Sequence, residues 1–62
     1  MINNKDELIP GNVYVYCDGI IQDNLIYVGE TRFKGLYSFY SMNNNKTVRY
    51  VWFVISKYIK SI

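Results

Sequence analysis

The sequence of 62 residues predicts an all-β fold, a small antiparallel meander that ends in a short helical turn. Three observations support this class. Apolar and polar residues alternate with a period of two in several short stretches, as expected for half-buried strands. Short runs of Gly, Asn and Asp separate these stretches. Helical spacing of apolar residues occurs only near the end of the chain, and nothing suggests a boundary inside residues 1–62, so we expect one domain.

The first strand follows an opening segment that we expect to be flexible or to form one helical turn, residues 1–9. Pro10 ends that segment because it disfavours helical backbone at the residue before it. Residues 12–17 then alternate, with Val13 and Val15 on one face and Tyr14 and Tyr16 on the other, which predicts a strand.

Three turn signals separate the middle strands. Asp18 and Gly19 form a pair that favours a tight turn, and Asp23 with Asn24 predicts a second break after the short run at residues 20–22. We expect the next strand at residues 25–29, a charged loop at residues 30–35 and another strand at residues 35–42. The run of three asparagines at 43–45 tolerates left-handed backbone and predicts the turn that follows.

The last segment changes its period within one continuous run of apolar residues. Residues 46–53 are rich in β-branched and aromatic side chains, which suits a strand with Trp52 in the core. From residue 54 to residue 62 the apolar residues recur at helical spacing, which predicts a short amphipathic helix. Its apolar stripe contains Val54, Ile55, Tyr58, Ile59 and Ile62.

The composition argues against catalysis, cofactors and metals. The chain has no histidine and one cysteine, so it cannot form an internal disulfide and lacks the ligands of a structural zinc site. Cys17 has no histidine base to activate it. The spacing of Asp18, Asp23 and Glu30 matches no calcium loop, so we interpret them as solvated loop carboxylates. We therefore expect a protein that is not an enzyme.

Targeting signals are also not evident. The longest apolar run, residues 50–55, is far shorter than the ~20 residues of a membrane helix. The first eleven residues contain no apolar stretch of the kind found in signal peptides. A free cysteine suits a reducing compartment. We expect a cytoplasmic protein without a membrane partner.

Aromatic residues exceed what so small a core can hide, which predicts an exposed partner-binding face. If Val13, Val15 and Trp52 point inward, the face contains tyrosines of three strands. Arg32, Phe33 and Lys34 place an aromatic ring between two cations at a loop tip; Phe33 either faces a partner or tucks under the sheet. The predicted partner-binding residues are Tyr14, Tyr16, Arg32, Phe33, Lys34, Tyr37, Arg49 and Tyr50.

Charges are divided unevenly along the chain. All five acidic residues and one lysine lie in residues 1–30, for a net charge of about −4, and six basic residues lie in residues 31–62. One interpretation is chance in a short sequence. The other is a surface of two signs that pairs with a second copy or with a polarised partner. Together with exposed sheet edges, the second interpretation predicts a homodimer.

The order of these elements over residues 10–62 resembles the SH3-like barrels: a Pro-Gly turn, a strand, an irregular connection, three strands in hairpin order and a helical turn. The ligand-groove signature of true SH3 domains is missing, so binding of proline-rich peptides is not implied. The abundance of Asn, Ile, Tyr and Lys is similar to that of small bacteriophage proteins. That resemblance implies a phage-encoded inhibitor that binds a larger host protein, either a defence protein or an enzyme, and blocks it sterically in the host cytoplasm.

A second function remains open from sequence alone. A small barrel could bind nucleic acid, with basic side chains on phosphates and an aromatic ring stacked on a base. The residues that would serve this function are Arg32, Phe33, Lys34 and Arg49.

Overall fold

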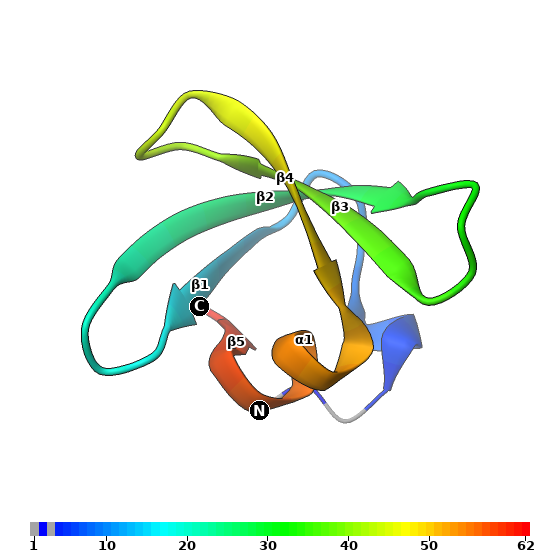
Figure 1. Cartoon of the computed structure of the whole chain (residues 1–62), viewed down its shortest axis with the longest axis horizontal. Coiled ribbons are helices and arrows are strands. Elements are labelled where there is room, and N and C mark those ends of the chain that lie inside the picture. The colour runs from blue at the N-terminus through cyan, green and yellow to red at the C-terminus, as the bar shows by residue number, and fades with distance from the viewer. Residues whose placement is uncertain (1, 3) are drawn as a thin grey trace.

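A computed structural model describes residues 2 and 4–62 as one five-stranded antiparallel sheet with a short helix near its C-terminal end (Figure 1). The strand order is β4-β3-β2-β1-β5, so neighbours in sequence pair and the last strand returns to the first. The predicted class, all-β with a small helical piece, is confirmed. The elements are η1 (Lys5–Glu7), β1 (Val13–Cys17), β2 (Gln22–Glu30), β3 (Leu36–Ser41), β4 (Lys46–Val51), α1 (Trp52–Tyr58) and β5 (Ile59–Ser61).

The core lies on the concave side of the twisted sheet, where α1 and β5 cover it (Figure 1). Strand β3 shows the alternation most clearly, since Tyr37, Phe39 and Ser41 are buried while the residues between them face outward. This is the alternation expected for the strand at 35–42. The buried apolar residues come from every part of the chain: Ile2, Leu8, Tyr14, Leu25, Tyr27, Tyr37, Phe39, Ile55 and Ile59.

The predicted facing of β1 is wrong. Tyr14 is only 2% exposed, whereas Val13 is 37% exposed. The tyrosine tolerates burial because its polar end is satisfied: its hydroxyl accepts a hydrogen bond from the backbone N–H of Ile9 (2.8 Å) and donates one to the carbonyl of Glu7 (2.8 Å). A buried hydroxyl with both partners avoids the cost of desolvation. The ring also meets Phe39 edge-on, at 6.4 Å between centroids.

Two further predictions about aromatic residues need correction. Tyr37, expected on the exposed face, is 6% exposed and belongs to the core. Trp52, expected at the centre of the core, is only partly buried and packs against its margin, 6.0 Å from the ring of Tyr37. Trp52 begins α1, so it lies where the chain leaves the sheet and its ring covers the core from the side.

The predicted helix at 54–62 is displaced and shortened, because α1 covers Trp52–Tyr58 and the next three residues form β5. The backbone N–H of Ile59 still donates to the carbonyl of Ile55, and the chain then becomes extended. Ile59 is opposite Tyr16 of β1 and is 1% exposed, whereas Ile62 is 82% exposed. The single apolar stripe expected in this segment is therefore divided between a helix and a strand.

The opening segment, expected to be flexible or to form one helical turn, contains the 3-10 turn η1. The Asn4 side chain caps it by accepting a hydrogen bond from the N–H of Asp6 at 2.9 Å. Ile2 (1% exposed) and Leu8 (6% exposed) are part of the core, so at these two positions the segment is packed. Met1 and Asn3 lie outside the described residues.

Neither α1 nor η1, the helices of the described part of the chain, has the length and apolar character needed to cross a bilayer.

Candidate functional site

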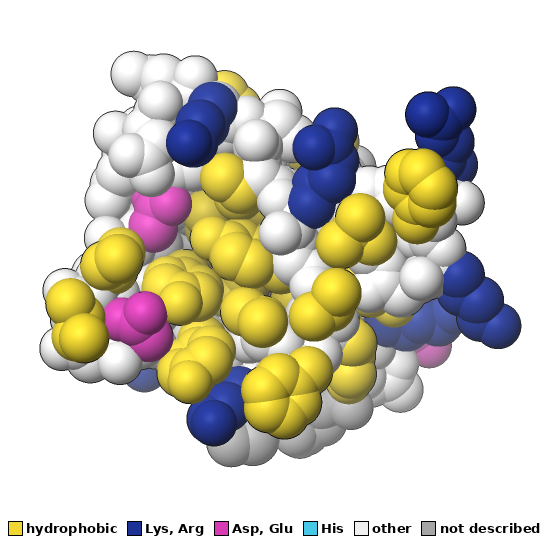
Figure 2. All heavy atoms as spheres, in the orientation of Figure 1, with side chains coloured by type: hydrophobic (Ala, Val, Ile, Leu, Met, Phe, Trp, Pro, Cys, Tyr) yellow, Lys and Arg dark blue, Asp and Glu magenta, His cyan; other side chains and the backbone are white. Residues whose placement is uncertain are grey.

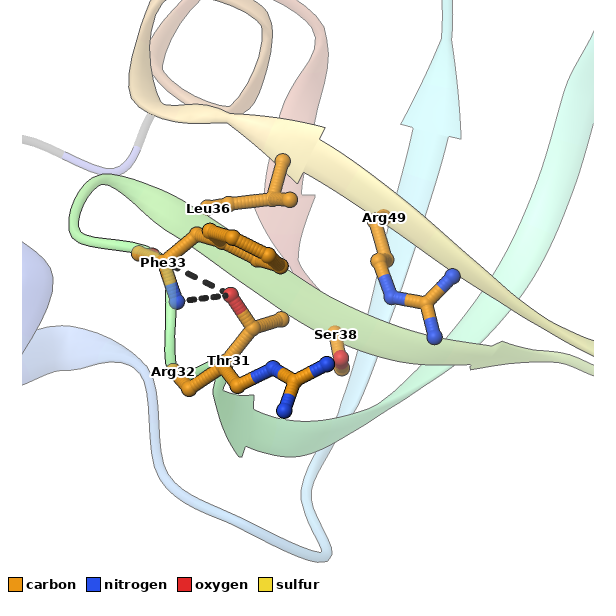
Figure 3. A pocket seen from close by; sticks show the side chains of 6 residues that line it. All are labelled: Thr31, Arg32, Phe33, Leu36, Ser38 and Arg49. Atoms are coloured by element: carbon orange, nitrogen blue, oxygen red, sulfur yellow. Dashed lines mark hydrogen bonds between the residues drawn. The ribbon is translucent and has the colours of Figure 1, made fainter.

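A cleft of about 500 Å³ opens beside the loop between β2 and β3 (Figure 3). Its walls come from this loop, from the outer face of β3 and from β4. Six residues line it: Thr31, Arg32, Phe33, Leu36, Ser38 and Arg49. Three of them, Arg32, Phe33 and Arg49, are predicted partner-binding residues, although Arg49 is 16 positions away from Phe33 in the sequence. The pairing of β3 with β4 brings them together.

The loop holds its shape through its own hydrogen bonds. The backbone N–H of Thr31 donates to the carbonyl of Leu36 at 2.9 Å, which closes the loop. The Thr31 hydroxyl accepts from the N–H of Phe33 and donates to its carbonyl, both at 3.1 Å. Phe33 consequently projects outward, with its side chain 61% exposed, and the guanidinium of Arg32 lies 5.4 Å from the ring centroid. Of the two orientations open for Phe33, the structure has the outward one.

The floor of the cleft is built around Ser38. On one side Ser38 pairs with Arg49 of β4, and on the other side it pairs with Gly29 of β2, just after a β-bulge. Gly29 has a φ of 150°, in the region that favours glycine, and contributes no side chain beside Ser38. Figure 3 shows the guanidinium of Arg32 ending beside Ser38, whereas the side chain of Arg49 extends from β4 on the other side of the same cleft.

The two guanidinium groups of the cleft form no ion pair or hydrogen bond with residues 2 and 4–62, and neither does the Ser38 hydroxyl. The neighbouring acid Glu30 does not form an ion pair with either arginine. Glu30 pairs with Tyr37, whose side chain points into the core, so Glu30 lies on the other face of the sheet from Ser38. Burial, and then the nearby charge of Glu30, raise the pKa of Tyr27. The cleft therefore has a net positive charge.

A second candidate surface is the tip of the β1–β2 hairpin, where two adjacent isoleucines face water. Ile20 is 92% exposed and Ile21 is 59% exposed. Asp18 fixes the turn below them, since its Oδ1 accepts the backbone N–H groups of Ile20 (2.9 Å) and Ile21 (2.8 Å). Its Oδ2 accepts a hydrogen bond of 2.9 Å from the hydroxyl of Tyr16.

These hydrogen bonds change the titration of both groups. The N–H groups of Ile21 and Ile20, followed by the Tyr16 hydroxyl, lower the pKa of the Asp18 carboxyl below its ordinary value. The same bond to Asp18 is the main cause that raises the pKa of Tyr16 to about 12. Asp18 is thus an ionised turn residue at neutral pH that holds the two isoleucines in place.

Aromatic rings extend the apolar surface from this hairpin toward α1. Tyr16 stacks on Tyr50 of β4 with 5.5 Å between ring centroids, and it lies 5.8 Å from the ring of Tyr58 of α1. Phe53 is 69% exposed, with the Lys57 ammonium 5.5 Å from its ring centroid. Figure 2 shows hydrophobic side chains across the middle of this face, between the β1–β2 hairpin and α1, with basic side chains around much of its border.

The predicted partner-binding residues therefore fall into three groups. Arg32, Phe33 and Arg49 line one cleft, and Lys34 is exposed on the same loop. Tyr16 and Tyr50 stack in the partly buried aromatic surface. Tyr14 and Tyr37 are buried and have little surface to offer a partner.

Sequence reasoning missed three strongly exposed apolar residues as parts of a partner-binding face, Ile20, Ile21 and Phe53. A usable signal existed for the isoleucines: two β-branched apolar residues stand between the Asp18–Gly19 turn and the break expected at Asp23 and Asn24, too few to form a buried strand. The break itself is wrong, because β2 runs through both residues. The interpretation of Asp23 as a solvated carboxylate is wrong. Asp23 is 5% exposed, and its Oδ2 accepts a hydrogen bond of 2.6 Å from the hydroxyl of Ser41.

Among residues 2 and 4–62, no three side chains of His, Cys, Asp or Glu come together as a group that could hold a metal ion. No protein-family model, curated protein or solved structure matches this chain.

Proposed function

We propose that this protein is a non-catalytic protein-binding module that docks through the tip of its β1–β2 hairpin and the adjoining aromatic surface. The observation that carries the proposal is the exposure of Ile20 and Ile21 on a turn fixed by Asp18. Exposed apolar side chains that adjoin one another mark binding surfaces more often than isolated ones do. A turn that is already ordered loses little conformational entropy when a partner covers it.

The surroundings of the tip suit a protein partner. Tyr16, Tyr50 and Tyr58 provide partly buried rings with polar ends, the side chains that contribute most to protein interfaces. Lys57 and the other exposed cations can form rim contacts. On this account the protein acts by covering a surface of a larger protein, which for an enzyme or a defence protein amounts to steric inhibition. The similarity in composition to phage proteins favours a host protein in the cytoplasm as the target.

Within the all-β class, we propose that the fold is an SH3-like barrel. The strand order β4-β3-β2-β1-β5 supports it, because the last strand returns to the first after the short helix α1 between β4 and β5. Figure 1 supports it as well, since the strands cross at large angles and curl around one side.

A pull-down comparison tests the binding function. Immobilised wild-type protein, a double variant with Ile20→Asn and Ile21→Asn, and a control with Ile62→Asn are exposed to a bacterial lysate. Ile62 is 82% exposed, so the control removes a similarly exposed isoleucine from another place. We expect a protein captured by the wild type and the control and lost with the double variant. Equal capture by all three proteins, or none by any, would contradict the proposal.

Nucleic-acid binding remains the second candidate, favoured by the meeting of Arg32, Phe33 and Arg49 in one cleft. Its expected signature is an affinity for single-stranded DNA or RNA that falls steeply with salt. Fluorescence anisotropy at low salt measures it, and a flat titration there removes this candidate. The placement of Lys46 on the face opposite Arg49 argues against a long phosphate track.

A further inference from the structure

We propose that the cleft beside the β2–β3 loop binds a small ligand that carries both a phosphate group and a planar ring. The phosphate would lie between Arg32 and Arg49 above Ser38, and the ring would lie against Phe33. This inference goes beyond the proposed protein-binding function and does not rest on it. The apolar tip at Ile20 and Ile21 lies just before β2 begins, and the loop that lines the cleft starts just after β2 ends. The two sites are therefore at opposite ends of this strand.

The phosphate half of the proposal rests on the two guanidinium groups. They line the same cleft from different elements, and no described residue forms an ion pair or a hydrogen bond with either of them (Figure 3). Each guanidinium can donate two parallel hydrogen bonds to an oxyanion. A phosphate monoester has three terminal oxygens and a charge near −2 at neutral pH, so it can satisfy both arginines at once. A carboxylate has one charge and two oxygens, and would leave part of this donor set unused.

The ring half of the proposal rests on Phe33. Its side chain is 61% exposed although the loop is ordered by the hydrogen bonds of Thr31, so the exposure is fixed by the local structure. An exposed ring in a fixed position is a stacking platform for another flat ring, as in proteins that bind bases. Leu36 adds an apolar wall beside it.

The size of the cleft limits the ligand. A volume of about 500 Å³ lies within the range of small-molecule sites, which is about 300–1,000 Å³. The next base along β4 is Lys46, but it pairs with the buried Ser41 and so lies on the opposite face from Arg49. The geometry thus provides for one phosphate and one ring, rather than for the repeated phosphates of a polymer.

Amide NMR titration of the whole protein tests this site with probes that separate its parts. Uridine monophosphate and phenyl phosphate carry both groups, uridine carries a ring alone and inorganic phosphate carries the anion alone. We expect both ring-bearing phosphates to shift the amides of residues 31–38 and Arg49 saturably. Uridine and inorganic phosphate should need concentrations higher by about tenfold, because each lacks one set of contacts. A preference between the two ring-bearing probes tells a nucleotide source from an aryl phosphate source.

Variants locate the binding within the cleft. Arg49→Gln and Arg32→Gln should each raise the Kd for the ring-bearing phosphates about tenfold, the loss expected for one charge-assisted contact. Lys46→Gln is the matched control, since it removes one positive charge from the same strand on its opposite face. It should change Kd by less than about twofold, because exposed charges beyond the contact are screened. Arg32 lies in the loop outside the strands, so Arg32→Gln still tests the cleft if Arg49→Gln disturbs the pairing of β4.

Four results would overturn the proposal. They are inorganic phosphate binding as tightly as the ring-bearing probes, an equal loss of affinity in the Lys46 variant, binding of a single-stranded oligonucleotide without binding of the mononucleotide, and no saturable shift with any probe.

Discussion

At the scale of single residues, Asp23 and Ser41 form a buried polar pair, although charged and polar side chains usually lie at the surface. The Ser41 hydroxyl donates to Asp23 at 2.6 Å and accepts from the backbone N–H of Asn44 at 3.2 Å. The Asn44 side-chain amide also donates to it, at 3.1 Å. This small network ties β2 to the turn after β3. Both Asp23 and Ser41 are almost fully buried; the Ser41 hydroxyl is the partner of Asp23 Oδ2, while Oδ1 accepts a longer hydrogen bond of 3.4 Å from the backbone N–H of Asn43.

Replacing Ser41 with alanine should destabilise the protein by about 1–3 kcal/mol, because it leaves a buried carboxylate oxygen of Asp23 without its partner. Urea unfolding followed by Trp52 fluorescence measures the change. Ser38→Ala is the control on the same strand, since Ser38 faces outward and makes no hydrogen bond with described residues; it should stay within about 0.5 kcal/mol. Equal effects of the two variants would show that the Ser41 network contributes no stability.

Tyr16 and Asp18 predict how stability changes at the two extremes of pH. The pKa of Asp18 is lowered in the folded state, so its stabilising effect is present at neutral pH and is lost as the pH falls through the folded-state pKa. The pKa of Tyr16 is raised from 10.0 to about 12, so the stabilising effect of the neutral phenol is complete below pH 10 and is lost as the pH rises through about 12.

An ultraviolet titration of tyrosinate checks the alkaline half of this prediction. Tyr16→Phe should remove a component that titrates near pH 12 from the wild-type curve. Asp18→Asn should move that component to lower pH, because an amide does not repel the phenolate. If neither variant alters the late part of the curve, the bond between Tyr16 and Asp18 does not persist in solution.

At the scale of elements, the end of the chain provides the sharpest contrast between sequence pattern and structure. Ile59 and Ile62 have the spacing of one helical face, yet Ile59 is 1% exposed and Ile62 is 82% exposed. The difference arises because the chain leaves α1 at Ile59 and pairs with β1. Ile59→Ala should therefore destabilise the protein by about 2–5 kcal/mol.

Ile62→Ala should change the free energy of unfolding by less than about 0.5 kcal/mol. The total free energy of unfolding of a domain of this size is only about 3–5 kcal/mol, so the Ile59 variant should be partly or wholly unfolded at 25 °C. Circular dichroism melting of the two variants compares their stabilities: the structure predicts a much lower melting temperature for Ile59→Ala than for Ile62→Ala. Similar melting curves would mean that a continuous helix to residue 62 describes the protein better than β5 does.

Local patterns predicted most of the strands and turns because those depend on neighbours in sequence. The alternation in β3 and the three asparagines before β4 are examples, and Asn45 indeed has a left-handed φ of 55°. Strand β5 could not be predicted in this way, because its three residues are extended only by pairing with β1, more than forty positions earlier. The facing of Tyr14 likewise depends on hydrogen-bond partners from the segment before it.

The cleft shows the same division between local and long-range information. Arg32, Phe33 and Lys34 form a visible group in the sequence, and the outward position of Phe33 follows from the local bonds of Thr31. That Arg49 joins them over Ser38 depends on the register between β3 and β4, which no local pattern specifies.

At the scale of the whole molecule, the division of charge along the chain does not become a clean division in space. Strand β5 places Lys60 opposite Val15 in the acidic half of the sequence, and Asp23 is buried. Electrostatic pairing of two copies therefore has less support than the sequence indicated. The exposed apolar side chains of the hairpin tip and α1 give self-association a different physical basis, since covering them removes apolar area from water.

We accordingly predict a homodimer at concentrations on the order of tens of micromolar, held mainly by apolar contacts. Sedimentation velocity should give the same degree of association at about 0.05 M and about 0.5 M salt, because screening weakens charge pairs and leaves apolar burial intact. The double variant of Ile20 and Ile21 to asparagine should weaken association about tenfold. The Ile62→Asn control should not, although Ile62 is nearly as exposed as Ile20. A monomer at both salt concentrations would contradict the prediction, and a dimer that disappears at high salt would favour the charge-paired arrangement instead.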